Sequence, residues 1–130
     1  MTLKTATISV VALMGIHAIA LIFNLYHQFL WLDIPMHLGG GLVVMLVALA
    51  FWSSCVDSIT FKRYARFSYL IEAVILLGFV ALIGIGWEGY EFILDQLVGG
   101  SRQPSIADTM ADFSFDLAGG IIGFILFRRV

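Results

Sequence analysis

Charged residues are scarce in this sequence, and their scarcity decides the class of protein. Of the 130 residues, 12% are charged and 61% are hydrophobic, and the mean hydropathy is +1.01. Soluble domains carry about 25% charged residues, because their surfaces face water. A folded chain of this length is mostly surface, so the composition excludes a soluble globular protein. We expect one integral membrane domain, residues 1–130.

Cysteine and basic residues are also few. Cys55 is the only cysteine, which excludes an intramolecular disulfide and a zinc site built from cysteines. Seven Lys and Arg residues, with a formal net charge of −2, provide no basic stripe of the kind that binds polyanions. The sequence therefore predicts no nucleic-acid partner.

Long apolar segments are what the sequence has instead. A bilayer core requires about 20 apolar residues of helix, and four segments qualify: Thr5–Asn24, Ile34–Ser53, Ser68–Leu94 and Ala107–Phe127. The first lacks a convincing cleavage site, so we interpret it as a retained helix. The connections Leu25–Asp33, Ser54–Phe67 and Asp95–Ile106 are short, which makes neighbouring helices antiparallel. The predicted fold is all-α, a four-transmembrane-helix antiparallel bundle.

The basic residues predict the orientation of this bundle. With four spans, both termini and the second connection share one side of the membrane. That side holds Lys4, Lys62, Arg63, Arg66, Arg128 and Arg129. The other side holds only Arg102. Short cytoplasmic loops are enriched in Lys and Arg, so we expect both termini to be cytoplasmic in a multi-pass protein of the cytoplasmic membrane.

Acidic residues and one histidine interrupt the apolar segments near the outer surface. They are Asp33, His37, Glu88, Glu91, Asp108, Asp112 and Asp116. Their spacing of three or four residues places them on one face of each helix. An ionisable side chain inside a span costs about 2.5–3.5 kcal/mol on insertion scales, so such residues usually face the bundle interior and have a function. Because the three segments begin or end on the same side, we expect these side chains at a similar depth.

A divalent metal ion is the most economical explanation of this cluster. Six carboxylates cannot all stay ionised side by side in a low dielectric, so a cation or protons must neutralise them. Carboxylates and neutral imidazole suit hard or borderline divalent metals, and facing helices of a bundle can supply them together. We therefore predict a divalent metal ion, of unspecified identity, held by all seven of these residues.

Several polar residues also have a structural interpretation, which the sequence leaves open. Asp33 is a candidate N-cap of the second helix, and Asp108 fits a capping box with Ser105. His17 is interpreted as a hydrogen-bonded core histidine. Glu72 is expected to reach Lys62, Arg63 or Arg66.

Glycines follow the polar residues on two helices. Gly39, Gly40 and Gly41 come directly after the Asp33 and His37 turn, and Gly119, Gly120 and Gly123 come after Asp116. Small residues let helices approach closely. We hypothesise that this brings ligands on neighbouring helices within reach of one centre.

The ordered set of polar residues resembles known families. It comprises Asp33-x-x-x-His37, then Trp87-Glu88-x-x-Glu91, then Arg102-x-x-Ser105-x-x-Asp108-x-x-x-Asp112-x-x-x-Asp116-x-x-Gly119-x-x-x-Gly123. In this order the residues resemble the VanZ-like and YjdF-like families of small bacterial membrane proteins. Ser101 stands where those families usually have Gly, and Asp116 where VanZ-like proteins often have Asn, which makes the chain look closer to the YjdF-like branch. The resemblance implies a membrane location, and the VanZ-like branch is associated with glycopeptide-antibiotic resistance at the cell envelope.

Three functions remain open at this point. The first is a metal-dependent hydrolase or phosphatase acting on a lipid-linked envelope substrate, with a metal-activated water as nucleophile. Glu88, Asp112 and Arg102 are its predicted catalytic residues, Arg102 pairing with a phosphate or carboxylate; the other interpretation of Arg102 is a surface ion pair. The second is a cation or proton transporter or channel subunit that uses the same carboxylates. The third is a membrane assembly partner without enzymatic activity.

Overall fold

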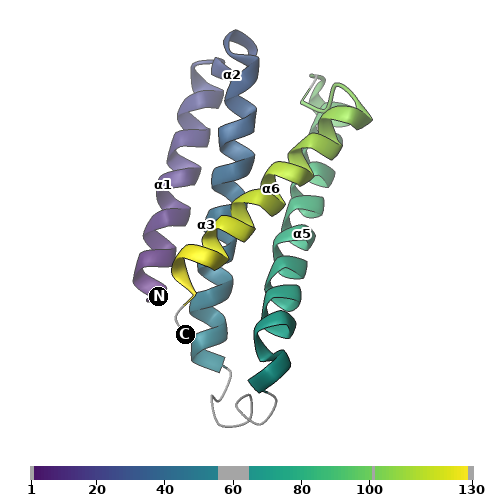
Figure 1. Ribbon diagram of the computed structural model, residues 1–130. Helices are drawn as coiled ribbons and strands as arrows, with labels where there is room; N and C mark the ends of the chain where they lie inside the picture. Colours follow the sequence, from purple (N-terminus) through teal and green to yellow (C-terminus); the bar gives the residue numbers. More distant parts are fainter. Residues whose placement is uncertain (1, 56–64, 101, 129–130) are drawn as a thin grey trace.

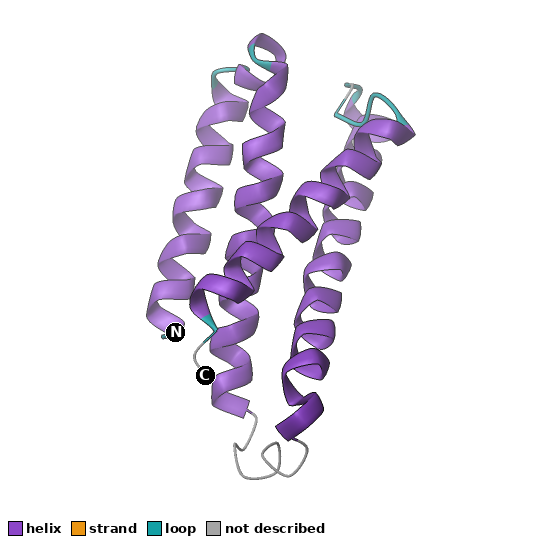
Figure 2. Ribbon diagram, viewed as in Figure 1, coloured by secondary structure: helices purple, strands orange, loops and turns teal. Residues whose placement is uncertain are grey.

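The described part of the protein consists of helices joined by short loops. The computed structural model describes residues 2–55, 65–100 and 102–128; Lys62, Arg63, Ser101 and Arg129, which entered the sequence analysis, lie outside these ranges. The helices are α1 (Leu3–Ile22), α2 (Leu25–Gln28), the 3-10 helix η1 (Leu30–Leu32), α3 (Asp33–Cys55), α5 (Ala65–Val98) and α6 (Ile106–Phe127). Figure 2 shows helices joined by short loops and no strand in the described part.

Four of these helices are long and apolar enough to cross a membrane. The candidate spans are Leu3–Ile22, Leu30–Ser54, Ser68–Val98 and Ile106–Phe127. The predicted all-α, four-span architecture is therefore confirmed, and the chain is a multi-pass membrane protein embedded in a lipid bilayer. One boundary was wrong: α5 continues past Leu94, so Asp95 lies in its last turn and not in a loop.

Helix α3 lies at the centre of the arrangement. Helix α1 packs on one side of α3, α6 crosses it obliquely, and α5 packs against both α6 and α3. The start of α1, the end of α6, the end of α3 and the start of α5 lie at one end of the molecule (Figure 1). We call this the terminal end. The other end carries α2, η1 and the loop between α5 and α6, and we call it the site end.

The apolar core lies towards the terminal end. It is formed by Met45, Ala48 and Leu49 of α3, Leu76 and Val80 of α5 and Phe124 of α6. Met45 and Val80 are almost fully buried. Many other large apolar side chains on the helices are exposed, as expected when the surrounding solvent is lipid. The packed core therefore closes the bundle between its two ends.

Glycines set the close crossing of α3 and α6. A Cβ added at Gly41 would overlap the backbone carbonyl of Asp116, and one added at Gly119 would overlap the backbone carbonyl of Leu38. Only glycine allows this approach of the two backbones. The close packing expected from these glycines is thus present, and it fixes Asp116 beside the turn of α3 that carries His37.

A charged pair joins α5 and α6 at the terminal end. Arg128 directs Nη2 to Glu72 Oε2 at 2.8 Å, and its guanidinium lies 4.5 Å from the centre of the Tyr69 ring. Glu72 was expected to reach Lys62, Arg63 or Arg66, and this stays a prediction because Lys62 and Arg63 lie outside the described residues. Within the described part Glu72 pairs with Arg128, because α6 ends next to the first turns of α5.

Candidate metal centre

His37 lies at the centre of a buried polar cluster at the site end. Its ring is 5% exposed, and its Nε2 lies 3.6 Å from Asp33 Oδ1, 3.8 Å from Glu88 Oε1 and 3.9 Å from Asp112 Oδ1. Its other nitrogen, Nδ1, lies 3.4 Å from Asp116 Oδ1. Helices α3, α5 and α6 thus bring four carboxylates to a single imidazole.

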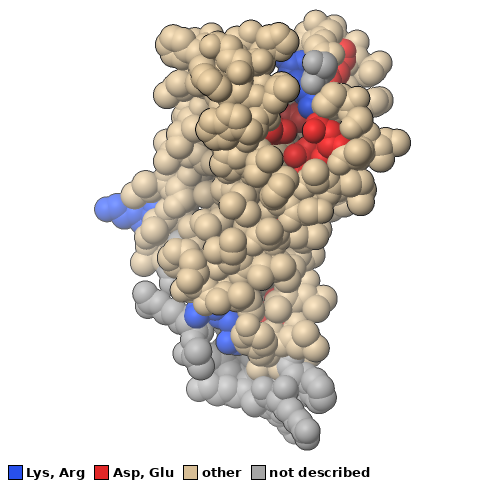
Figure 3. Space-filling model, turned by 45° about the horizontal axis from the view of Figure 1, so that its top comes forward, with Lys and Arg blue, Asp and Glu red and all other residues tan. Residues whose placement is uncertain are grey.

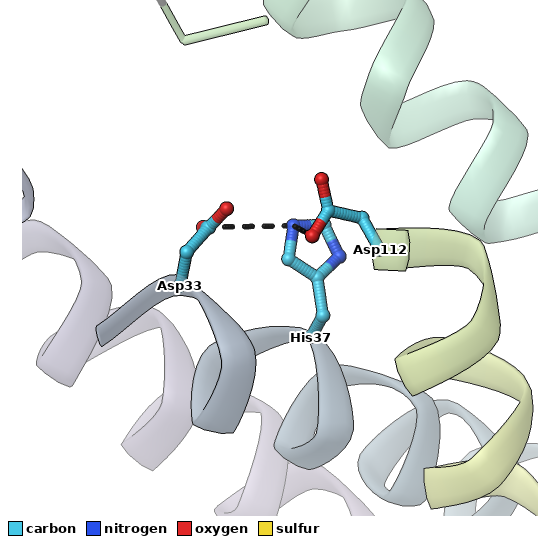
Figure 4. Close-up of side chains that lie close together, drawn as sticks. All are labelled: Asp33, His37 and Asp112. Atoms are coloured by element: carbon cyan, nitrogen blue, oxygen red, sulfur yellow. Dashed lines mark ion pairs between the residues drawn. The ribbon is translucent and has the colours of Figure 1, made fainter. Parts of the chain in front are cut away.

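Three of these residues form a group that can hold a metal ion. One ligand atom each from Asp33, His37 and Asp112 lies within 4.8 Å of the other two. Ligand atoms about 2.1 Å from a tetrahedral ion lie roughly 3.4 Å from one another, so the three side chains would have to move closer together to bind one. Figure 4 shows the polar ends of the three side chains pointing towards one another, with Asp33 and His37 on α3 and Asp112 on α6.

Glu88 supplies an oxygen that has no hydrogen-bond donor. The residue is 3% exposed, and its Oε2 accepts a 2.6 Å hydrogen bond from Gln103 Nε2. Its Oε1, the atom that faces His37, is buried and has no hydrogen-bond partner. A buried carboxylate oxygen without a donor is costly, so this atom requires an explanation that the described protein atoms do not provide.

Asp116 occupies the opposite side of the imidazole from the other three carboxylates. It lies in a space bounded by glycines: a Cβ at Gly84 would be 2.6 Å from Asp116 Oδ2 and one at Gly40 would be 3.7 Å from Asp116 Oδ1. A proton held on Nδ1 towards Asp116 leaves the Nε2 lone pair directed at the remaining carboxylates. Asp116 was predicted as a ligand, and this geometry suits a residue that orients His37.

Glu91 and Asp108 lie near the cluster but outside the group of three. Glu91 Oε1 accepts a 3.1 Å hydrogen bond from Trp87 Nε1. Asp108 lies in the first turn of α6, where its backbone N–H donates to Ser105 Oγ at 3.1 Å. Ser105 is therefore the N-cap of α6, as the capping box suggested. Asp33 is not an N-cap, because its backbone is already helical (φ −62°, ψ −43°).

Arg102 lies in the loop between α5 and α6 and pairs with a carboxylate at the end of α5. Its Nη1 lies 2.8 Å from Asp95 Oδ1, and Asp95 Oδ2 accepts hydrogen bonds from the backbone N–H groups of Arg102 and Gln103. Of the two interpretations of Arg102, the ion pair is the one that the structure contains. The side chain is 34% exposed and lines a polar cavity described below.

Gln103 is a site residue that the sequence analysis missed. Besides its bond to the Glu88 carboxylate, its Nε2 donates to the Glu88 backbone carbonyl at 3.0 Å. No periodicity marks a loop glutamine as a partner of a residue fifteen positions earlier. The only available indication was that a buried Glu88 would need a donor close to the end of its own helix.

Two cavities adjoin the cluster. The first, about 160 Å³, lies between α1, α3 and α5 and reaches Asp33, His37 and Glu91. The second, about 520 Å³, lies at the site end and is lined by polar residues including His27, Asp33 and Arg102. Figure 3 shows acidic side chains gathered in a recess at this end, beside a basic one, with uncharged surface around them.

Tyr26 and His17 lie where the two cavities meet. His17 Nδ1 and the Tyr26 hydroxyl are 2.7 Å apart, and the His17 ring contacts Trp87 edge-on with 5.1 Å between centroids. His17 therefore has the structural contacts expected of a core histidine. Burial, together with the nearby Asp33 and Glu91 carboxylates, raises the pKa of Tyr26 to about 12, so its hydroxyl remains protonated at neutral pH.

Comparison with known proteins identifies a family but no function. No curated protein and no solved structure matches this chain. A family model described as "Predicted membrane protein (DUF2238)" matches residues 2–130. The match supports the membrane location expected from the resemblance, although not the more specific VanZ-like or YjdF-like assignment. Because the match covers nearly the whole sequence, the chain belongs to this family of predicted membrane proteins, DUF2238.

Proposed function

We propose that the protein binds a divalent metal ion between α3, α5 and α6 and uses it for hydrolysis at the membrane surface. The observation that carries the proposal is the buried, unpartnered Glu88 Oε1 facing His37 Nε2. The same nitrogen faces Asp33 and Asp112. A cation among these four groups would satisfy the orphaned oxygen and the imidazole lone pair together.

The charge of the cluster supports a cation more strongly than a proton network. Asp33, Glu88, Asp112 and Asp116 surround one histidine, which carries at most a single positive charge. Charges buried in a membrane protein are stable only when they are paired or bound to a metal. A divalent ion neutralises two carboxylates, and protonated His37 would neutralise only one.

The donor set limits the choice of metal. Three carboxylate oxygens and one imidazole nitrogen suit Zn²⁺, Mn²⁺ or Fe²⁺, whereas a site made only of oxygens would favour Mg²⁺ or Ca²⁺. The imidazole would be oriented by Asp116 through Nδ1, as carboxylates commonly orient metal-bound histidines. We therefore assign Asp33, His37, Glu88 and Asp112 as ligands and Asp116 as the positioning residue.

A metal placed there can activate water. Bound divalent ions lower the pKa of water towards about 7 and stabilise developing negative charge on oxygen. Asp33 is the most accessible of the assigned ligands, with 32% of its side chain exposed, and it is the carboxylate best placed to accept a proton from that water. Arg102 pairs with Asp95 through Nη1 and lines the polar cavity, where its other guanidinium nitrogens would bind an anionic substrate. With both termini cytoplasmic, the centre lies in the outer leaflet of the cytoplasmic membrane.

The apolar core argues against a transport pathway. A pathway would have to continue from the cluster to the terminal end, yet Met45, Val80 and Phe124 are at most 3% exposed and pack together about two helical turns below it. The polar groups thus form a pocket open on one side.

Metal analysis of purified protein tests the proposal. We expect detergent-purified wild type to contain about one equivalent of a divalent metal by elemental analysis, and H37A and E88Q to contain none. The matched controls are H17Q, a histidine outside the cluster, and E72Q, a second buried glutamate of α5. Wild type without metal after incubation with Zn²⁺, Mn²⁺ and Fe²⁺, or H37A with unchanged metal, would contradict the assignment.

A further inference from the structure

The cavity between α1, α3 and α5 is an apolar cleft at membrane depth. Its floor is α3, and its walls carry apolar side chains of α1 and α5. The apolar lining residues include Val10, Leu13 and Met14 of α1, Val43 and Val44 of α3, and Val80 and Ile83 of α5. All of them belong to candidate membrane spans. What surrounds the open side of this cleft is therefore lipid.

The cleft adjoins the polar cavity at the site end. His17, Tyr26, Asp33 and Glu91 line both. Beyond them the lining is mixed, with the polar Asn24, His27 and Arg102 beside apolar residues such as Leu21 and Leu30. A ligand that fits both compartments is apolar along one part and polar, with negative charge facing Arg102, at its other end.

We infer that the cleft admits the hydrocarbon chain of a single phosphate-bearing bilayer lipid, which enters laterally between α1 and α5 and brings its headgroup to the His37 cluster. The position of the hydrocarbon chain is argued from the cleft alone. The position of the headgroup rests on the proposed metal centre, and it makes a lipid phosphate ester the substrate class of that centre.

The width of the cleft favours a lipid chain over a helix of a partner protein. His17 and Trp87 touch across it, with 5.1 Å between ring centroids, and so bridge its two walls beside the polar cavity. A helix with side chains is about 10–12 Å wide, too wide to lie between walls that touch at this point. A hydrocarbon chain needs much less width than a helix.

Photolabelling in vesicles tests the chain position. The probe is phosphatidic acid with a diazirine in one acyl chain, mixed into phosphatidylethanolamine vesicles that contain the full-length protein. We expect labelling of peptides carrying Met14, Val43 and Ile83, and about a tenfold loss of this labelling in I83W, whose indole fills the cleft. The matched control is I75W, because Ile75 is a similarly exposed isoleucine of α5 outside the cleft.

Two further arms separate this inference from the proposed function. Metal content is measured on the same samples, and a diazirine-labelled diacylglycerol, which lacks phosphate, replaces the probe in parallel. Stronger cleft labelling by phosphatidic acid than by diacylglycerol, lost on chelation, supports the headgroup position. Cleft labelling that I83W removes, in wild type that takes up no metal from Zn²⁺, Mn²⁺ or Fe²⁺, supports the chain position and overturns the metal centre.

The inference itself is overturned by either of two results. Equal labelling of I83W and I75W would mean that the label comes from bulk lipid around the helices. If metal-loaded wild type shows no cleft labelling, the cleft does not hold a lipid chain, whether or not the probe cross-links to a second copy of the protein. The proposed metal centre would be unaffected by that result.

Discussion

Two buried charged clusters lie at opposite ends of the bundle, and they differ in whether the protein completes them. At the terminal end, Glu72 and Arg128 form one pair of opposite charges, with two guanidinium nitrogens each 2.8 Å from the same carboxylate oxygen. At the site end, four carboxylates face one histidine, and Glu88 Oε1 has no donor. In the first cluster the opposite charges are equal in number. In the second, carboxylates outnumber the histidine and one buried oxygen has no hydrogen-bond donor among the described residues.

This difference separates a structural role for buried charge from a functional one. A buried pair that is fully satisfied holds two elements together, here the end of α6 and the start of α5. An excess of one charge is unfavourable for folding and persists where a ligand removes the cost. Substitutions in the two clusters and at the helix crossing test this difference.

Metal should stabilise the site end and leave the terminal end unaffected. At a free metal concentration about 1,000 times Kd, linkage contributes about 4 kcal/mol of stability, which appears as a rise in the Tm of wild type in detergent. D112N should lose this rise and, in chelator, be at least as stable as wild type, because one of several like charges has been removed. A D112N variant that keeps the metal-dependent rise in Tm would contradict the assignment of Asp112 as a ligand and the proposed difference between the two clusters.

Removing one member of the terminal pair should destabilise the protein whatever the metal. E72Q leaves the Arg128 guanidinium without its counter-charge, and we expect a loss of about 3 kcal/mol, the lower limit for a buried pair, because the Arg128 side chain is 18% exposed. Thermal unfolding with metal and with chelator measures the loss. The double variant E72L/R128L should recover most of it; failure to recover would mean that Glu72 has another role.

Replacing glycine by alanine should destabilise the protein at the crossing of α3 and α6 and be tolerated in the middle of α5. G41A places a Cβ against the Asp116 carbonyl, so α3 and α6 must separate, at a cost of about 2 kcal/mol. G78A meets nothing within 4 Å in the middle of α5 and should be neutral or slightly stabilising. Because Asp116 moves with α6, G41A should also weaken metal binding, whereas a loss of stability without any change in affinity would separate the crossing from the site.

The smallest effect is expected from the loop glutamine. Q103A removes the donor to Glu88 Oε2, a hydrogen bond to a charged group, and metal affinity should fall about tenfold, or about 1.4 kcal/mol. Isothermal titration with Zn²⁺ or Mn²⁺ measures this directly. Q103E, which adds another acid next to Glu88, should have a larger effect on the apo protein than Q103A.

The sequence predicted the fold well because each span is a local property. Twenty apolar residues identify a crossing without knowledge of any contact, and alternating crossings place the start of α3, the end of α5 and the start of α6 on one side. That argument was sufficient to expect Asp33, His37, Glu88 and Asp112 at one depth. It could not tell which nitrogen of His37 faces which carboxylate, since this depends on how closely the glycines let α3 and α6 approach.

The parts that could not be predicted are contacts between segments distant in the chain or in irregular loops. Gln103 reaches Glu88 across the turn that follows α5. Arg102 turns back to Asp95 because α5 extends far enough to offer that carboxylate. Glu72 pairs with Arg128, fifty-six residues later in the sequence. Each of these depends on packing that periodicity does not report.

The oblique crossing of α6 over α3 has a consequence for how the protein is made. Of the four candidate spans, α6 has the lowest hydropathy, 1.6 against 2.0 to 2.4, since it carries Asp112 and Asp116. It leaves the ribosome after α3, so the glycines and His37 of α3 are already in the bilayer when α6 arrives. We expect the glycine face of α3 to assist the insertion of α6, so that the acidic site assembles in the same step as that insertion.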